Sequence, residues 1–127
     1  MADTVGSNTV GWFVEAKVKD GRLDDFAALV DEMVAGTAAE AGTTNYEWYL
    51  SEDGTTIHIW EKYADSDAAL SHVQGFIEKW SGRFGECVEM TRFDVYGSPD
   101  DRIKATVGGL QPAAVVLVVG DAAPAGW

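Results

Sequence analysis

Residues 44–63, TNYEWYLSEDGTTIHIWEKY, predict a β-hairpin with strands at 44–50 and 55–63. Both strands are rich in aromatic and β-branched residues, and the Ser-Glu-Asp-Gly segment between them has the composition of a tight turn. Side chains alternate along a strand, so a register symmetric about the turn gives the hairpin two faces. One face carries Tyr46, Trp48, Leu50, Ile57, Ile59, Glu61 and Tyr63, and the other carries Asn45, Glu47, Tyr49, His58, Trp60 and Lys62.

A strand and a helix precede the hairpin. Polar and apolar residues alternate over residues 9–18, which predicts a first strand. Apolar residues then recur at helical spacing from Leu23 to Val34, and Gly42 is the expected C-terminal stop of that helix. The helix therefore lies between the first strand and the hairpin.

A second helix and a fourth strand follow the hairpin. Acidic residues at 65–67 favour a helix start, and Gly75 and Gly82 are expected to kink this helix or to end it early. Residues 87–96 predict the fourth strand. The resulting β-α-β-β-α-β order is that of a ferredoxin-like α+β domain with an antiparallel sheet.

The C-terminal part predicts a short extension of this domain. Ser98-Pro99-Asp100-Asp101 has the composition of a helix start, with Ser98 as the expected capping residue, and Gly108-Gly109 is the expected end. Residues 115–119 predict a fifth strand. A length of 127 residues fits one domain. We expect a flexible N-terminus at 1–8, the domain at 9–97, the extension at 98–119 packing on a dimer, and a tail at 120–127.

Composition excludes several classes of partner. Nine Lys and Arg residues against 21 Asp and Glu give a formal net charge of −12, so nucleic acids and anionic membrane surfaces are not expected as partners. Cys87 is the only cysteine, which excludes an internal disulfide and fits a reducing compartment. The sequence has no signal-peptide pattern and no membrane-spanning run, so the expected location is cytoplasmic.

Apolar residues on both faces of the sheet predict a homodimer. Two helices can cover only one face, and the other would leave Phe13, Tyr49 and Trp60 in water. The sheet of a second copy would cover them. A monomer with a solvated second face is the alternative, because Glu15, Lys17, Glu47 and Lys62 lie on that face too.

Two ionisable residues are candidates for chemistry. His72 falls at the rim of the apolar stripe of the second helix, where an imidazole suits proton abstraction at neutral pH. The alternative is a half-exposed surface histidine. Glu61 lies in the middle of an apolar face, so it either anchors a buried network with the nearby tyrosine hydroxyls or with Arg92, or takes part in proton transfer.

Aromatic side chains near these residues could bind a flat ligand. Tyr46, Trp48 and Tyr63 from the hairpin and Phe76 from the second helix are the candidates, although aromatic residues on a core face also serve as core alone. The sequence has no phosphate-binding glycine loop and no cysteine or histidine metal motif. We expect no metal and no cofactor.

Three segments in this order resemble the antibiotic biosynthesis monooxygenase (ABM) family. They are VKDGRLDDF at 18–26, EAGTTNY at 40–46 and EKYAD at 61–65, with His72 downstream. The resemblance implies a dimeric α/β barrel and an enzyme that oxygenates an electron-rich phenol, quinol or anthrone with dioxygen, without metal or flavin. It also implies that Tyr46, Glu61, Tyr63 and His72 line the cavity between sheet and helices.

Two other functions remain alternatives. A non-catalytic ligand-binding or accessory dimer of the same fold would have a cavity filled by Trp48, Phe76 and Trp80. A branch of the superfamily binds and degrades haem with an asparagine on the first strand. The matching position here is Val14, which counts against haem.

Overall fold

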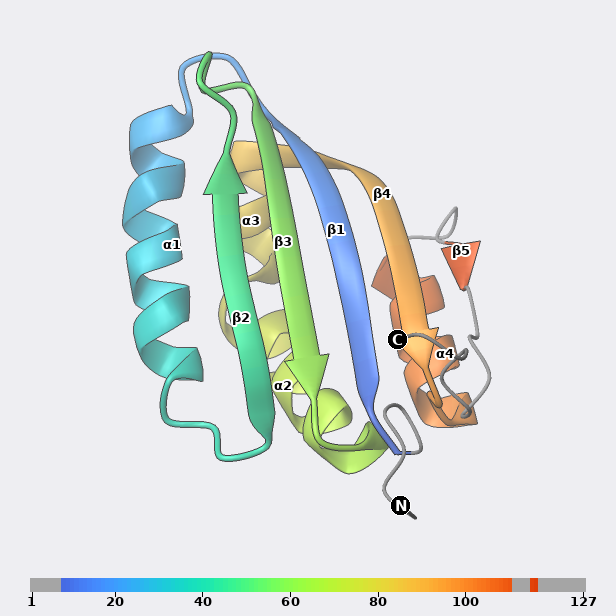
Figure 1. The fold of residues 1–127 in the computed structure, drawn as a ribbon. Coiled ribbons are helices and arrows are strands. Elements are labelled where there is room, and N and C mark those ends of the chain that lie inside the picture. The colour runs from blue at the N-terminus through green and yellow to red at the C-terminus, as the bar shows by residue number, and fades with distance from the viewer. Residues whose placement is uncertain (1–7, 111–114, 117–127) are drawn as a thin grey trace.

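The computed structural model describes residues 8–110 and 115–116 of the chain, and Figure 1 shows their arrangement. The strands and helices are, in chain order, β1 (Val10–Val18), α1 (Leu23–Thr37), β2 (Thr43–Leu50), β3 (Thr56–Tyr63), α2 (Ser66–Lys79), α3 (Ser81–Cys87), β4 (Val88–Gly97), α4 (Asp101–Leu110) and β5 (Val115–Val116). The predicted ferredoxin-like α+β fold is confirmed.

One sheet holds the described strands in the order β2-β3-β1-β4-β5. The first four pair antiparallel, and the two residues of β5 pair parallel with β4. The hairpin register agrees with the prediction, since Tyr46 lies opposite Glu61 and Trp48 lies opposite Ile59. Gly54 has a φ of 73° in the turn, a conformation that glycine adopts without steric cost.

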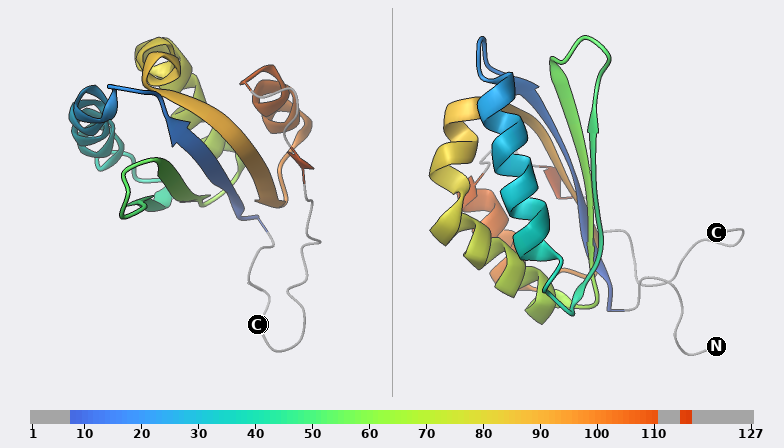
Figure 2. Two further views of the ribbon diagram at one scale, coloured as in Figure 1. Left: turned by 90° about the horizontal axis from the view of Figure 1, so that it is seen from above. Right: turned by 90° about the vertical axis from the view of Figure 1, so that its left-hand side faces the viewer.

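The helices lie together on one face of the sheet, as both views in Figure 2 show. The apolar side of β1 enters the core against them through Val10, Trp12, Val14 and Ala16. On the opposite face Tyr49 is 54% exposed and Trp60 is 47% exposed. Phe13 also lies on that face but is buried, because His58, Trp60 and Arg92 pack around its ring.

The helix boundaries differ from the predictions at two glycines. Helix α1 ends at Thr37, so the prediction of an end at Gly42 is wrong. Gly42 instead allows close approach to α2, since a Cβ on it would lie 2.5 Å from Ala68 Cβ. Helix α2 continues past Gly75 to Lys79, and the chain bends at Trp80 before α3.

Smaller corrections apply to the C-terminal half. Cys87 is the last residue of α3, and β4 begins one residue later than expected, at Val88. The side chain of Asp100, and not that of Ser98, accepts the backbone N–H of Ile103 at the start of α4. This helix continues to Leu110, past the expected end at Gly108-Gly109, and buries Ile103 and Val107 in the hydrophobic core. Of the predicted strand 115–119, residues 117–119 lie outside the described residues, as do 1–7 and 120–127.

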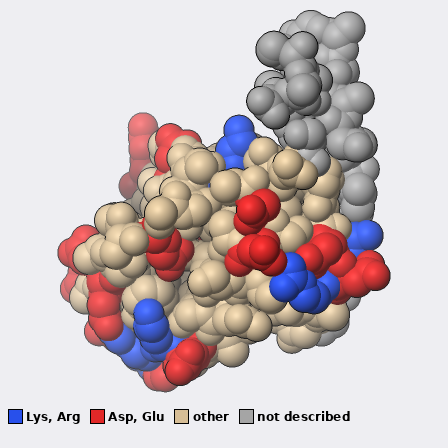
Figure 3. All heavy atoms as spheres, turned by 90° about the horizontal axis from the view of Figure 1, so that it is seen from below, with Lys and Arg blue, Asp and Glu red and all other residues tan. Residues whose placement is uncertain are grey.

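No helix in the described part of the chain is long and apolar enough to cross a membrane. The surface that Figure 3 presents carries acidic side chains over most of its width, with basic side chains beside them rather than in a patch of their own. This distribution agrees with the formal net charge of −12.

Candidate functional site

His72 lies on the inner side of α2, where the helix faces the sheet. Asp65 fixes the start of this helix by accepting the backbone N–H of Ala68 at 2.9 Å. Ala69 and Val73, on either side of His72, are buried in the core, and the His72 side chain itself is only 4% exposed. The alternative of a half-exposed surface histidine is therefore wrong.

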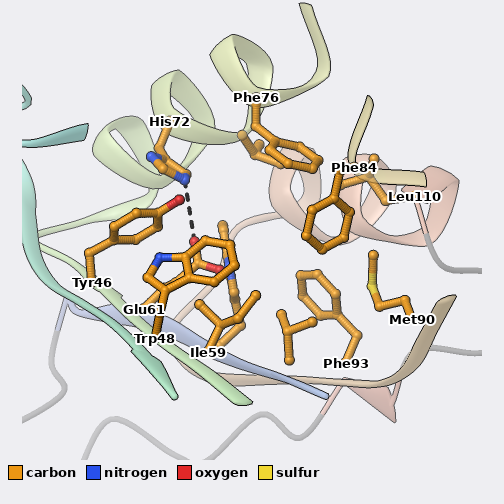
Figure 4. A pocket seen from close by; sticks show the side chains of 13 residues that line it. Tyr46, Trp48, Ile59, Glu61, His72, Phe76, Phe84, Met90, Phe93 and Leu110 are labelled. Carbon is orange, nitrogen blue, oxygen red and sulfur yellow. Dashed lines mark ion pairs between the residues drawn. The ribbon is translucent and has the colours of Figure 1, made fainter. Parts of the chain in front are cut away.

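Both ring nitrogens of His72 face carboxylates. Nδ1 lies 2.8 Å from Glu40 Oε1, and Nε2 lies 3.3 Å from Glu61 Oε1 (Figure 4). Burial disfavours the charged imidazole, but hydrogen bonds and charge from Glu61 and Glu40 outweigh burial and raise the pKa of His72 above its usual value. The ring is thus held as a donor at both nitrogens.

Glu61 is anchored by a tyrosine as well as by His72. Its side chain is 9% exposed, and its Oε1 accepts the Tyr63 hydroxyl at 2.5 Å. The suggested pairing with Arg92 is wrong, because Arg92 lies on the opposite face of the sheet and pairs with Asp94 at 2.6 Å. Glu61 therefore belongs to a buried network and at the same time forms part of a cavity wall.

The two tyrosines of this network are proton donors and not bases. Burial, followed by the charge of Glu61, raises the pKa of Tyr46 and the pKa of Tyr63 well above the value of a free phenol. Their rings pack against the imidazole, with centroids 5.4 Å and 5.1 Å from that of His72. Both phenols stay neutral at physiological pH and can donate a hydrogen bond.

A narrow cavity lies between the sheet and the helices (Figure 4). Apart from the polar groups of Tyr46, Glu61 and His72, its lining is apolar: Trp12, Val14, Trp48, Ile59, Val73, Phe76, Phe84, Met90, Phe93 and Leu110. Its volume is about 40 Å³, which holds about one to three water molecules, whereas a cavity known to bind benzene has about 150 Å³. The indole N–H of Trp48 is buried and has no acceptor within the described part of the chain.

Most candidate site residues meet at this cavity. Tyr46, Trp48, Glu61, His72 and Phe76 line it, whereas Tyr63 lies behind Glu61 and does not. Trp80 is not in its lining either and packs over Gly36.

Glu40 is a site residue that the sequence does not predict. It lies in the loop between α1 and β2, 32 residues before His72, and no periodic pattern connects the two. The close approach of Gly42 to Ala68 brings this loop to α2, and that contact exists only in the folded chain.

The described residues at this site do not form a suitable ligand set for a metal ion or for haem iron. No group of three or more His, Cys, Asp or Glu side chains within residues 8–110 and 115–116 is arranged to hold a metal ion. His72 is the only imidazole at the cavity, and both of its nitrogens already face carboxylates. It presents no free nitrogen as an axial ligand.

Comparison with known proteins identifies the family. The model of the antibiotic biosynthesis monooxygenase family matches residues 10–81, more than half of the chain. The chain belongs to this family. The matched segment contains Glu40, Tyr46, Glu61 and His72, so the described cavity lies largely inside the ABM region. Among curated protein sequences, no significant match is found.

Solved structures share the ABM fold at low sequence identity. MupZ from Pseudomonas fluorescens matches with a TM-score of 0.72 and 20% identity, covering 88% of this chain and 90% of its own. Rv0793 from Mycobacterium tuberculosis has a TM-score of 0.60 and 24% identity, with coverages of 73% and 97%. SnoaB, a cofactor-independent oxygenase from Streptomyces nogalater, has a TM-score of 0.60 and 14% identity, with coverages of 73% and 95%. At these identities the comparison establishes the fold alone.

Proposed function

We propose that this ABM-family chain is a cofactor-independent monooxygenase that oxidises an electron-rich aromatic of the phenol, quinol or anthrone type with dioxygen. The observation that carries the proposal is a buried Glu61–His72 pair in the wall of an otherwise apolar, aromatic cavity. A proton acceptor in a water-poor pocket is what such chemistry requires from the protein.

In the proposed reaction, the pair removes the acidic proton of the substrate. The resulting anion gives one electron to dioxygen, and the substrate radical and superoxide combine to a peroxide anion. This anion takes back a proton from the pair and becomes a hydroperoxide. Loss of water then yields the quinone, so an anthrone CH₂ group and O₂ become a carbonyl group and H₂O. Tyr46 donates a hydrogen bond to the substrate oxygen, and Tyr63 keeps Glu61 in place.

An aromatic substrate requires the cavity to widen, because about 40 Å³ does not hold a ring. Trp48 and Phe76 are half-buried, so rotation of their side chains costs less than movement of fully buried core residues. The indole N–H of Trp48 has no acceptor in the described part of the chain, so after displacement of Trp48 it could donate a hydrogen bond to a substrate oxygen.

The small cavity supports a second candidate function, a non-catalytic ligand-binding or accessory dimer. If the cavity does not widen, the chain binds no ring and turns over no substrate. Titration of an anthrone or quinol into the protein, followed by tryptophan fluorescence, separates the candidates, because Trp48 and Trp12 line the cavity. Binding without oxygen uptake supports the accessory function.

The decisive experiment measures oxygen uptake by protein treated with a chelator, with an anthrone and a quinol as substrates. We expect quinone formation at one O₂ per turnover for the wild type. His72→Ala should lower kcat about 100-fold or more, as is typical for loss of a group that takes part in proton transfer. His58→Ala is the matched control, because His58 lies on the opposite sheet face paired with Glu15, and it should keep full activity. An unchanged rate in His72→Ala rejects the role of His72.

We also propose that the chain forms a homodimer through the helix-free face of the sheet. Tyr49 and Trp60 are exposed there within one subunit and form an apolar surface beside the buried Phe13. A second copy of the same face would cover both side chains.

A further inference from the structure

Glu40 connects the buried His72 to the protein surface. Its Oε1 lies 2.8 Å from His72 Nδ1 and also accepts the hydroxyl of Thr43 at 2.8 Å, which holds the carboxylate in place. The Glu40 side chain is 32% exposed, against 4% for His72 and 9% for Glu61. Of the three side chains in the chain of contacts Glu61–His72–Glu40, only that of Glu40 therefore reaches solvent to a large extent.

A surface groove lies at Glu40, the exposed end of the contacts that connect Glu61, His72 and Glu40. Its lining includes Glu40, Thr43 and Tyr46, and Tyr46 lines the inner cavity as well. Tyr46 thus stands between the cavity and the groove, while Glu40 and His72 provide a continuous hydrogen-bonded connection beside it. Among the described residues, no donor contacts the second carboxylate oxygen of Glu40.

We infer that Glu40 is a positioning residue that holds His72 as a donor at both nitrogens and exchanges the Nδ1 proton with solvent through the groove. A proton arriving at Glu61 from the cavity removes the charge that stabilises the imidazolium, so the Nδ1 proton of His72 passes to Glu40 while the Nε2 proton stays in place. The ring need not rotate, and the network returns to its starting charge when Glu40 releases the proton to water. The catalytic part of this inference rests on the proposed function.

The groups that face His72 are few. They are Glu40 from the loop after α1, Tyr46 from β2, and Glu61 and Tyr63 from β3. The two tyrosines stay protonated in the physiological range, so the carboxylates of Glu40 and Glu61 are the charges that stabilise the imidazolium. Removal of the Glu40 charge must therefore change both the protonation of His72 and its access to solvent.

The first test needs no substrate. The chain has only two histidines, so ¹⁵N-labelled protein gives imidazole signals of His72 and His58 that can be followed by NMR against pH. In Glu40→Gln, which keeps the size of the side chain, we expect the titration midpoint of His72 to fall by about one pH unit or more. We expect exchange of its Nδ1 proton with water to slow about 10-fold or more, since an amide does not relay protons at neutral pH.

Glu15→Gln is the matched control. Glu15 pairs with His58 at 3.0 Å, the same kind of contact on the other face of the sheet, so its loss should leave the His72 signals unchanged. If Glu40→Gln leaves the midpoint and the exchange rate of His72 as in the wild type, the inference is overturned.

The second test uses the oxygenase assay. Glu40→Gln should lower kcat about 10-fold with little change in KM, because Glu40 does not line the cavity. In Glu40→Ala, formate should restore part of kcat, since the groove admits a small carboxylate to the vacated position. A wild-type kcat in Glu40→Gln overturns the exit role. An inactive wild type contradicts the proposed function instead, and the NMR result then decides the inference alone.

Discussion

At the scale of single residues, the site depends on where the fold places charge. Glu61 occupies a strand position that faces the core, and a carboxylate there is tolerated because Tyr63 and His72 donate to it. His72 in turn lies between Glu61 and Glu40, and neither contact exists in the unfolded chain. The protonation of His72 is therefore coupled to folding.

This coupling predicts how stability depends on pH. Because the folded pKa of His72 is raised, its imidazolium contributes stability that is complete below the unfolded pKa of about 6.5 and is lost as pH rises through the folded pKa. The free energy of unfolding should fall over that range with a slope of up to about 1.4 kcal/mol per pH unit. Urea unfolding from pH 5.5 to 9 measures it.

His72→Gln provides the comparison for this measurement, because all other titrating groups remain in both proteins. The difference in free energy of unfolding between wild type and His72→Gln should shrink as pH rises. A difference that stays constant across the range would mean that folding does not change the pKa of His72.

At the scale of elements, close backbone approaches depend on individual glycines. Gly97 ends β4 with a φ of 93°, and a Cβ at this position would lie 2.0 Å from the carbonyl oxygen of Thr9. Ser98 donates its backbone N–H to the same oxygen, so this contact fixes the start of β1 against the end of β4. Gly75 differs, since it lies inside α2 and a Cβ there would meet nothing within 4 Å.

These surroundings predict opposite effects for two identical substitutions. Gly97→Ala should destabilise the protein by about 3 kcal/mol or more, because the left-handed conformation and the backbone clash both oppose a side chain. Gly75→Ala should stabilise it by about 0.5–1 kcal/mol through improved helix propensity. Urea unfolding followed by circular dichroism measures both, and equal stabilities of the two variants would contradict the assignment.

Elements whose pattern is local were predictable from the sequence. The hairpin faces follow from alternation, and the inward stripe of α2 follows from the helical period, so Tyr46, Glu61 and His72 were placed on the cavity side. Helix α3 was missed because two of its seven residues are glycines, which disfavour a helix. Packing stabilises it instead, since Phe84 contacts Phe26 and Phe76.

Contacts between elements set the limit of such prediction. Glu40 reaches His72 only because the loop after α1 lies against α2, and Arg92 is unavailable to Glu61 because β4 turns it to the other face. Both outcomes depend on tertiary packing and on the full register of the sheet, which no pattern within one segment encodes.

At the scale of the whole molecule, the two faces of the sheet have different roles. The helices cover one face (Figure 2), and the cavity lies beneath them. The other face leaves Tyr49 and Trp60 exposed. Two ion pairs on this second face form within the chain, Glu15–His58 and Arg92–Asp94. Pairing reduces the cost of bringing two chains together, each with a formal net charge of −12.

The proposed dimer predicts a specific effect of one lysine. Trp60→Lys places a cation in the middle of the helix-free face, and a two-fold axis would bring it close to its own copy. We expect this variant to have the mass of a monomer in light scattering at micromolar concentration, with the wild type at twice that mass. Ile77→Lys is the control, because Ile77 is 41% exposed on α2, outside the sheet, and should leave the dimer intact. Circular dichroism checks that both variants fold, and a wild-type protein with the mass of one chain would refute the dimer and leave the Trp60 surface without a partner.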